Sequence, residues 1–304
     1  MKRLSWLVVL LLVVACGKRT AELPVENSVY FWRTEWQLDS ISKAFLQQHD
    51  IRKVYCRYFD VVMTDSMPMP NATIAFPEKV PQQLQLVPTV FITEDCMHRR
   101  HESLAEKIVS RILQINETND VDGVEEIQIN CDYTARSRKT FYDFLEEVLS
   151  EARAHGLRLS ATIRLHQLSM PAPLVDYGVL MLYNTESLQN PKVENSIISS
   201  KAVAEYMRHA RSDKHLDFAY PTYEWTLWFN DGKFKGIVSA GDTAAIKGDL
   251  RHEKSYFREI METKRILKRE LRDIDYPSST IIYHLDSTNL SKYSNDEITK
   301  IYSR

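Results

Sequence analysis

Two carboxylates are the side chains best suited to acid–base chemistry, because each follows an apolar run typical of a strand. Asp132 ends the run 126–131, and Glu224 comes shortly after the run 216–220. A pair of carboxyl groups with separately tuned pKa values can act as general acid and as base or nucleophile on a glycosidic bond. We therefore predict Asp132 and Glu224 as a catalytic pair.

Each carboxylate also has a structural interpretation. Asp132 could form an ion pair with Arg57 or Arg164, or cap the helix expected after it. Glu224 could be a solvated residue at the base of a hairpin. The sequence leaves these alternatives open.

Arginine, histidine and tyrosine occupy other predicted strand ends, and this mixture suits a sugar ligand. Aromatic faces can cover sugar rings, while guanidinium groups can bind hydroxyl groups. The predicted substrate-binding residues are Arg57, Arg164, His166, Tyr183 and Tyr223. Arg164 and His166 share one phase of their strand, so a structural network with Asp132 is the alternative role for both.

Short apolar runs alternate with amphipathic helices along the chain. Strands are expected at 29–32, 54–59, 89–93, 126–132, 157–166, 177–183, 216–220 and 280–285, and helices at 38–48, 102–113, 137–154, 200–210 and 253–273. This order predicts an α/β fold with a parallel sheet, and eight strands favour a somewhat irregular (β/α)8 TIM-like barrel over an open doubly wound sheet. A β-hairpin over 225–238, turning at Asn230-Asp231-Gly232, is expected as an insertion before the last helix.

Two of the expected strands alternate between apolar and polar residues. Ile127 and Ile129 alternate with Gln128 and Asn130, and the run 159–166 repeats this pattern. One face of each strand would pack under helices, while the other would point into the barrel and require hydrogen-bond partners there. Functional side chains are then expected at the carboxyl ends of the strands.

The first residues carry the features of a lipoprotein signal. Lys2 and Arg3 precede an apolar stretch over 4–14, and Cys16 follows small and aliphatic residues. We predict a signal peptide at 1–15, a tether at 16–27 with lipid on Cys16, and a single barrel domain at 28–304. An ordinary secretory signal is the alternative. Partners would then be a membrane, through the lipid, and a polysaccharide ligand. The residues after Cys16 favour the outer membrane, with a mild preference for its periplasmic side.

Composition argues against several other functions. The net charge of −2 gives no electrostatic footprint for nucleic acid, and neither GxGxxG nor GxxxxGK[ST] occurs. Cys56, Cys96 and Cys131 form no CxxC pair and are expected to be buried thiols, although one pair could form a disulfide. His98 and His101 are expected in a solvated loop, so we predict no metal and no cofactor.

Three runs, 55–61, 128–134 and 159–167, resemble an uncharacterised family of Bacteroidetes-type lipoproteins with a glycoside-hydrolase-like TIM barrel. The resemblance spans most of the chain after the signal. It implies the barrel fold and the envelope location, and it implies no established chemistry.

A second likeness is to retaining glycosidases of the barrel type, which place an acid/base glutamate after the fourth strand and a nucleophile after the seventh. Asp132 and Glu224 fall at those strands, but the first is an aspartate and the usual Asn-Glu pair is missing. The run 121–132 is also similar to the fourth strand of chitinase-like barrels. Gln128 and Asn130 stand there in place of acids, and no glutamate follows Asp132 two residues on, which argues against a substrate-assisted mechanism.

Overall fold

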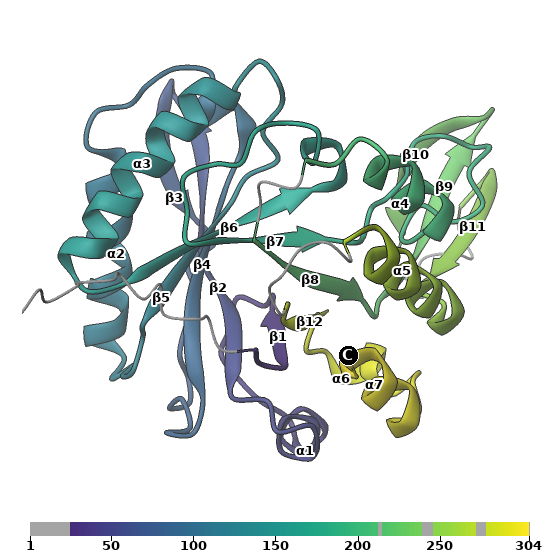
Figure 1. Ribbon diagram of the computed structural model, residues 1–304, viewed down its shortest axis with the longest axis horizontal. Helices are drawn as coiled ribbons and strands as arrows, with labels where there is room; N and C mark the ends of the chain where they lie inside the picture. Colours follow the sequence, from purple (N-terminus) through teal and green to yellow (C-terminus); the bar gives the residue numbers. More distant parts are fainter. Residues whose placement is uncertain (1–24, 212–214, 239–245, 272–277, 304) are drawn as a thin grey trace, which may run out of the picture.

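A closed barrel of eight parallel strands forms the body of the protein. The computed structural model describes residues 25–211, 215–238, 246–271 and 278–303. Around the barrel the strands are β1 (Ser28–Phe31), β2 (Lys53–Thr64), β4 (Gln85–Ile92), β5 (Glu126–Asn130), β6 (Arg158–Arg164), β7 (Tyr177–Met181), β8 (Leu216–Pro221) and β12 (Thr280–Tyr283) (Figure 1). Strand β1 pairs with both β12 and β2, which closes the sheet. The predicted (β/α)8 barrel is thereby confirmed, and the open sheet is excluded.

Helices surround the barrel unevenly. They are α1 (Ser40–Gln48), α2 (Leu104–Thr118), α3 (Arg138–Ala154), α4 (Ser200–Met207), α5 (Phe257–Glu270), α6 (Ser287–Leu290) and α7 (Asn295–Tyr302). Between β2 and β4 the chain forms β3 (Met67–Asn71), which is antiparallel to β2, and between β6 and β7 it forms only the 3₁₀ turn η2 (Leu165–Gln167). A second 3₁₀ turn, η1 (Glu94–Met97), precedes α2. These two strand connections account for the irregularity expected of the barrel.

Helix α3 shows how the sequence pattern becomes packing. Its apolar residues recur at intervals of three and four, so one stripe faces the strands and buries Phe141, Phe144, Leu145, Val148 and Leu149. The helix ends at Ala154 with His155 as its C-cap, and Gly156 follows with φ of +73°, a left-handed conformation that glycine adopts without steric cost.

The alternation along the strands separates two environments, as predicted. Ile127 and Ile129 belong to the core cluster under the helices. On the opposite face, Gln128 and Ser160 are fully buried inside the barrel and bind each other, with the Gln128 Nε2 donating to the Ser160 Oγ at 3.2 Å. Tyr30, which lies on β1 across the barrel, donates its hydroxyl group to the Gln128 Oε1 at 2.7 Å.

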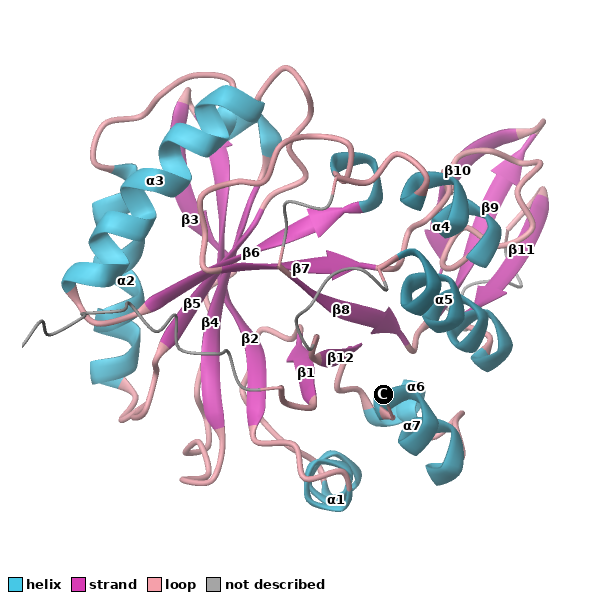
Figure 2. Cartoon of the chain, viewed as in Figure 1, coloured by secondary structure: helices cyan, strands magenta, loops and turns pink. Residues whose placement is uncertain are grey.

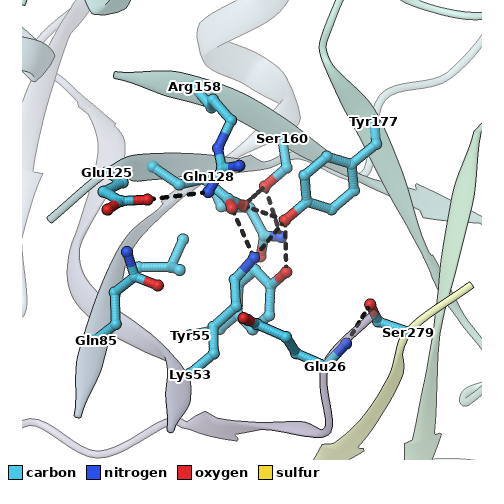
Figure 3. A network of polar contacts seen from close by, with 12 residues as sticks. Glu26, Lys53, Tyr55, Gln85, Glu125, Gln128, Arg158, Ser160, Tyr177 and Ser279 are labelled. Carbon is cyan, nitrogen blue, oxygen red and sulfur yellow. Dashed lines mark hydrogen bonds and ion pairs between the residues drawn. The ribbon is translucent and has the colours of Figure 1, made fainter. Parts of the chain in front are cut away.

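A buried ion pair, which the sequence pattern did not predict, lies in the same interior. The Lys53 Nζ lies 2.7 Å from the Glu126 Oε2 and donates to the Tyr177 hydroxyl at 2.8 Å. Tyr177 and Ser160 donate in turn to the Glu126 Oε1 at 2.5 and 2.7 Å. Figure 3 shows Lys53, Ser160 and Tyr177 converging from separate strands, with Tyr55 beside them.

A small antiparallel sheet is inserted after β8. It consists of β9 (Glu224–Asn230), β10 (Lys233–Val238) and β11 (Asp249–Lys254) in the order β10-β9-β11. The predicted hairpin is present, and its turn at Asp231 and Gly232 has positive φ at both residues. Figure 2 shows this inserted sheet beyond α4 and α5 at one side of the molecule.

The predicted hairpin is part of a larger sheet, and two other expectations about this region and the end of the chain were wrong. The hairpin supplies two of the three strands of that sheet, because β11 also pairs with β9. The predicted helix at 253–273 begins only at Phe257, since the preceding residues form β11. The helix is not the last one either, because α6 and α7 follow the final strand.

Cys56, Cys96 and Cys131 are buried free thiols, as expected. None of the helices within the described ranges is both long enough and apolar enough to cross a membrane.

Candidate functional site

Four aromatic side chains gather at the carboxyl ends of β1, β7, β8 and β12. Trp32, Tyr183, Tyr223 and Tyr283 form this rim aromatic cluster. The rings of Tyr183 and Tyr283 stack at 4.6 Å between centroids, and the Tyr223 ring meets Tyr183 edge-on at 6.1 Å. Trp32 lies 6.0 Å from Tyr283. Tyr183 is buried, and the other three are half-buried, so the cluster offers partly open aromatic faces at the rim.

The tyrosines of this cluster remain neutral at physiological pH. Burial raises the pKa of Tyr283 to about 12 and holds the pKa values of Tyr183 and Tyr223 well above the ordinary range. Their hydroxyl groups therefore act as neutral hydrogen-bond donors and acceptors. Tyr223 already donates to the Asn184 Oδ1 at 2.7 Å.

Asp132 and Arg164 form a two-pronged ion pair beside the cluster. The Arg164 Nε donates to the Asp132 Oδ1 at 2.5 Å, and Nη2 donates to Oδ2 at 3.2 Å. The guanidinium carbon lies 5.3 Å from the centroid of the Tyr183 ring. The Asp132 side chain is 48% exposed and that of Arg164 is 17% exposed. Arg57 and Arg164 were the two predicted ion-pair partners of Asp132, and the structure shows the pair with Arg164.

Arg57 also lies at the rim, but it forms an ion pair with a carboxylate of its own strand. Its Nε donates to the Asp60 Oδ1 at 2.8 Å, and its Nη2 donates to the other carboxylate oxygen. The guanidinium carbon lies 5.8 Å from the Trp32 ring. Arg57 therefore borders the rim aromatic cluster from the β2 side.

Glu224 lies at the start of β9 in the inserted sheet. Its Oε1 is 2.7 Å from the Lys292 Nζ, and its Oε2 is 3.7 Å from the His252 Nε2. Glu224 lines a cavity of about 730 Å³, and Tyr223 shares that lining, while Asp132 is not among the described lining residues. The structure therefore brings Asp132 together with Arg164 and Tyr183, and it brings Glu224 together with Lys292.

His166 lies on η2, immediately after β6, and is exposed. Its Nε2 is 3.4 Å from the Tyr133 carbonyl oxygen, which also accepts from the Gln167 Nε2 at 2.9 Å. His166 therefore contacts the loop after β5.

Two members of the rim aromatic cluster were not predicted as site residues. They are Trp32 and Tyr283, which fall within the expected strands 29–32 and 280–285. The signal that identifies both is the alternation phase. Trp32 follows inward-facing Tyr30 by two residues, and Tyr283 follows buried Ile281 by two.

In the described ranges, no group of three or more His, Cys, Asp or Glu side chains is arranged to hold a metal ion. Near the predicted loop histidines, Glu94 instead accepts from the hydroxyl groups of Thr134 and Ser137 at 2.6 and 2.8 Å. The Thr134 hydrogen bond is the main cause that lowers the pKa of Glu94. Glu94 thus ties the loop after β4 to the loop after β5.

Solved structures with a similar fold are glycoside-hydrolase-like barrels. The spore cortex-lytic enzyme SleL of Bacillus cereus aligns over 93% of this chain and 75% of its own, with 16% identity and a TM-score of 0.57. A chitinase from Chromobacterium violaceum aligns over 92% of this chain and 100% of its own, with 12% identity and a TM-score of 0.56. The C-terminal domain of a putative chitinase from Desulfitobacterium hafniense aligns over 92% and 99%, with 9% identity and a TM-score of 0.55. At these identities the likeness is one of fold.

No family model matches the sequence, and no curated protein matches it significantly.

Proposed function

We propose that the protein binds a glycan at the C-terminal rim of its barrel. The observation that carries this proposal is the rim aromatic cluster with the Asp132–Arg164 pair beside it. Partly open rings can pack on the apolar faces of sugars, while the exposed carboxylate and the tyrosine hydroxyl groups can bind sugar hydroxyl groups. The fold supports the same ligand class, because the similar barrels include chitinases.

The contacts of the two carboxylates favour binding over hydrolysis as the main function. Both oxygens of Asp132 accept from one guanidinium, whereas a general acid must present a protonated oxygen to the leaving group. Glycosidases that use two carboxyl groups place both against one glycosidic bond. Here Glu224 pairs with Lys292 and lines a cavity whose described lining does not include Asp132.

Hydrolysis is the second candidate function, and one observation favours it. Asp132 follows the fourth barrel strand directly and its side chain is 48% exposed, so a substrate can reach it. In this alternative Asp132 is the acid/base and Glu224 its partner. Arg57, Arg164 and His166 then orient the carboxylates, and Tyr183 and Tyr223 line the sugar site.

Replacing Trp32 with alanine tests the binding proposal. Removal of the half-buried indole takes away one aromatic face of the cluster, so we expect the affinity for chitohexaose to fall about tenfold. Isothermal titration with the full chain in detergent measures this change. Tyr206→Ala is the matched control, because Tyr206 is an exposed aromatic residue on α4 outside the cluster.

The same sugar separates the two candidate functions. Release of reducing ends from chitohexaose that stops in Asp132→Asn would establish hydrolysis as the main activity. Binding without such release supports the binding function. Equal affinities of the wild type and Trp32→Ala would rule out the rim aromatic cluster as the binding site.

We also propose that lipid on Cys16 anchors the protein to the envelope, at the periplasmic side of the outer membrane. The proposal rests on the sequence alone, because residues 1–24 lie outside the described ranges. The tether would join the barrel at β1, which begins at Ser28.

A labelling experiment checks the anchor. In bacterial cells grown with labelled palmitate, we expect label on the wild-type chain and none on Cys16→Ser, because a hydroxyl group cannot take the place of the thiol in thioether formation. Cys131→Ser is the control for the loss of a cysteine, since this thiol is buried. Label that persists in Cys16→Ser would contradict the proposal.

A further inference from the structure

The cavity beside Glu224 has the dimensions of a ligand site. Its volume of about 730 Å³ lies within the range that small-molecule sites occupy. It forms where the end of β11 and the first residues of α5 meet the start of β9 and the α6–α7 segment; its lining residues include Tyr223, Lys254, Ser255, Tyr256, Arg258 and Lys292. Figure 1 shows α5 between the inserted sheet and the α6–α7 segment.

Two cations of this cavity are not neutralised by its acids. Glu224 is paired with Lys292, and Glu297 accepts from the backbone N–H and the hydroxyl group of Ser294 as the cap of α7. Lys254 has no carboxylate partner within the described ranges. The Arg258 side chain is 90% exposed, and its contact with Glu259 is long, at 3.8 Å. Lys254 and Arg258 therefore give the cavity lining an excess of positive charge.

An aromatic side chain, Tyr256, lies between these two cations in the sequence and also lines the cavity. Tyr256 is 49% exposed, and the Lys254 Nζ is 5.0 Å from its ring centroid. Tyr256 therefore adds an exposed aromatic face to the cavity beside the Lys254 ammonium group.

The cavity and the rim aromatic cluster share a wall. Tyr223 lines the cavity, and its ring contacts Tyr183 of the cluster on one side and Trp225 of the inserted sheet, at 5.3 Å, on the other. A chain of sugars that lies on the cluster can therefore extend past Tyr223 into the cavity.

We infer that this cavity binds a carboxylate-bearing sugar of the glycan, so that the ligand is an acidic polysaccharide. Lys254 and Arg258 pair with the sugar carboxylate, and Tyr256 packs on the sugar ring. The inference rests on the proposed binding function and adds the chemical class of the ligand.

Two hexasaccharide probes test the inference. Hyaluronan hexasaccharide carries glucuronate carboxylates, and chitohexaose is neutral. At low salt, we expect the full chain to bind the acidic probe more tightly than the neutral one. We expect Lys254→Gln/Arg258→Gln to weaken binding of the acidic probe roughly tenfold or more. Chitohexaose affinity should not change in this double variant. Both replaced side chains are exposed, so the fold should not be affected.

The control variant is Lys235→Gln/Arg265→Gln, which removes the same charge from exposed positions of β10 and α5 that do not line the cavity. An equal loss of acidic binding in the control would show general charge attraction and overturn the inference. Unchanged acidic binding in Lys254→Gln/Arg258→Gln, with both probes still weakened by Trp32→Ala, would overturn the subsite alone. Failure of the wild type to bind either probe would overturn the rim proposal as well.

Discussion

Replacement of Lys53 with methionine is expected to lower the free energy of unfolding by about 3–5 kcal/mol, as for other buried ion pairs that lose one partner. The Glu126 side chain is only 1% exposed and lies 2.7 Å from the ammonium group. Methionine keeps the apolar stem of the lysine but leaves the carboxylate with only the hydroxyl groups of Ser160 and Tyr177 as donors. Urea denaturation at pH 7 measures the loss.

Lys139→Met is the matched control, because Lys139 pairs with Asp143 on the surface of α3, where both side chains are exposed. We expect the control to change the free energy of unfolding by less than about 1 kcal/mol. If Lys53→Met does not fold, Lys53→Met/Glu126→Leu should fold, since removal of both charges leaves no unpaired carboxylate. A loss below about 1 kcal/mol in Lys53→Met would show that the ion pair does not hold the barrel interior together.

The polar interior also positions the rim. Glu126, Gln128 and Asn130 lie in the same inward phase of β5 as Asp132 above them, and Ser160 and Thr162 precede Arg164 in the same way on β6. Hydrogen bonds join the two strands at successive levels, from Ser160 to Glu126 and from Thr162 to Asn130 at 2.9 Å. The Asp132–Arg164 pair is the last of these contacts between the two strands, at their carboxyl ends. Its geometry therefore depends on the register that the buried network holds.

Much of the barrel was predictable because its strands bury apolar side chains on one face and polar side chains on the other. An apolar face under the helices and a polar face inside the barrel give a period of two, which is readable in the run 126–132 and in the run 159–166. Strand β11 was not recognised because its sequence DLRHEK is polar and its partner β9 lies about 25 residues earlier. Helix α7 had a readable signal in the capping box formed by Ser294 and Glu297.

The rim could be predicted in part for the same reason. Asp132, Arg164 and Tyr183 share the inward phase on adjacent strands, so the fold alone brings them together. The contacts of Glu224 could not be read in this way, because Glu224 begins the inserted sheet, and its partners Lys292 and His252 belong to later segments. The pairing of Lys53 with Glu126 joins positions 73 residues apart across the barrel, and no local pattern encodes that distance.

Asp217, in β8, belongs to the same interior and has a pKa that makes the stability of the protein depend on pH. Burial raises its pKa to about 6, against the opposing effects of the Ser279 backbone N–H, which donates at 2.6 Å, and of Lys53. In the unfolded chain an aspartate titrates near pH 4. Between these values the native state binds the proton more tightly, so the contribution of Asp217 to stability is fully present below about pH 4 and is lost as the pH rises through 6.

Asp217→Asn is therefore expected to remove a pH-dependent loss of about 3 kcal/mol from the free energy of unfolding. This is the free energy that corresponds to a shift of about two pKa units. The amide oxygen of asparagine can still accept from Ser279, and no charge is buried at any pH. In urea denaturation from pH 4.5 to 8, the variant should lose less stability than the wild type as the pH rises. Asp143→Asn is the control, because this exposed carboxylate should leave the wild-type pH dependence unchanged. Parallel curves for Asp217→Asn and the wild type would mean that Asp217 already carries its charge at low pH, and that Lys53 serves two carboxylates in the barrel interior.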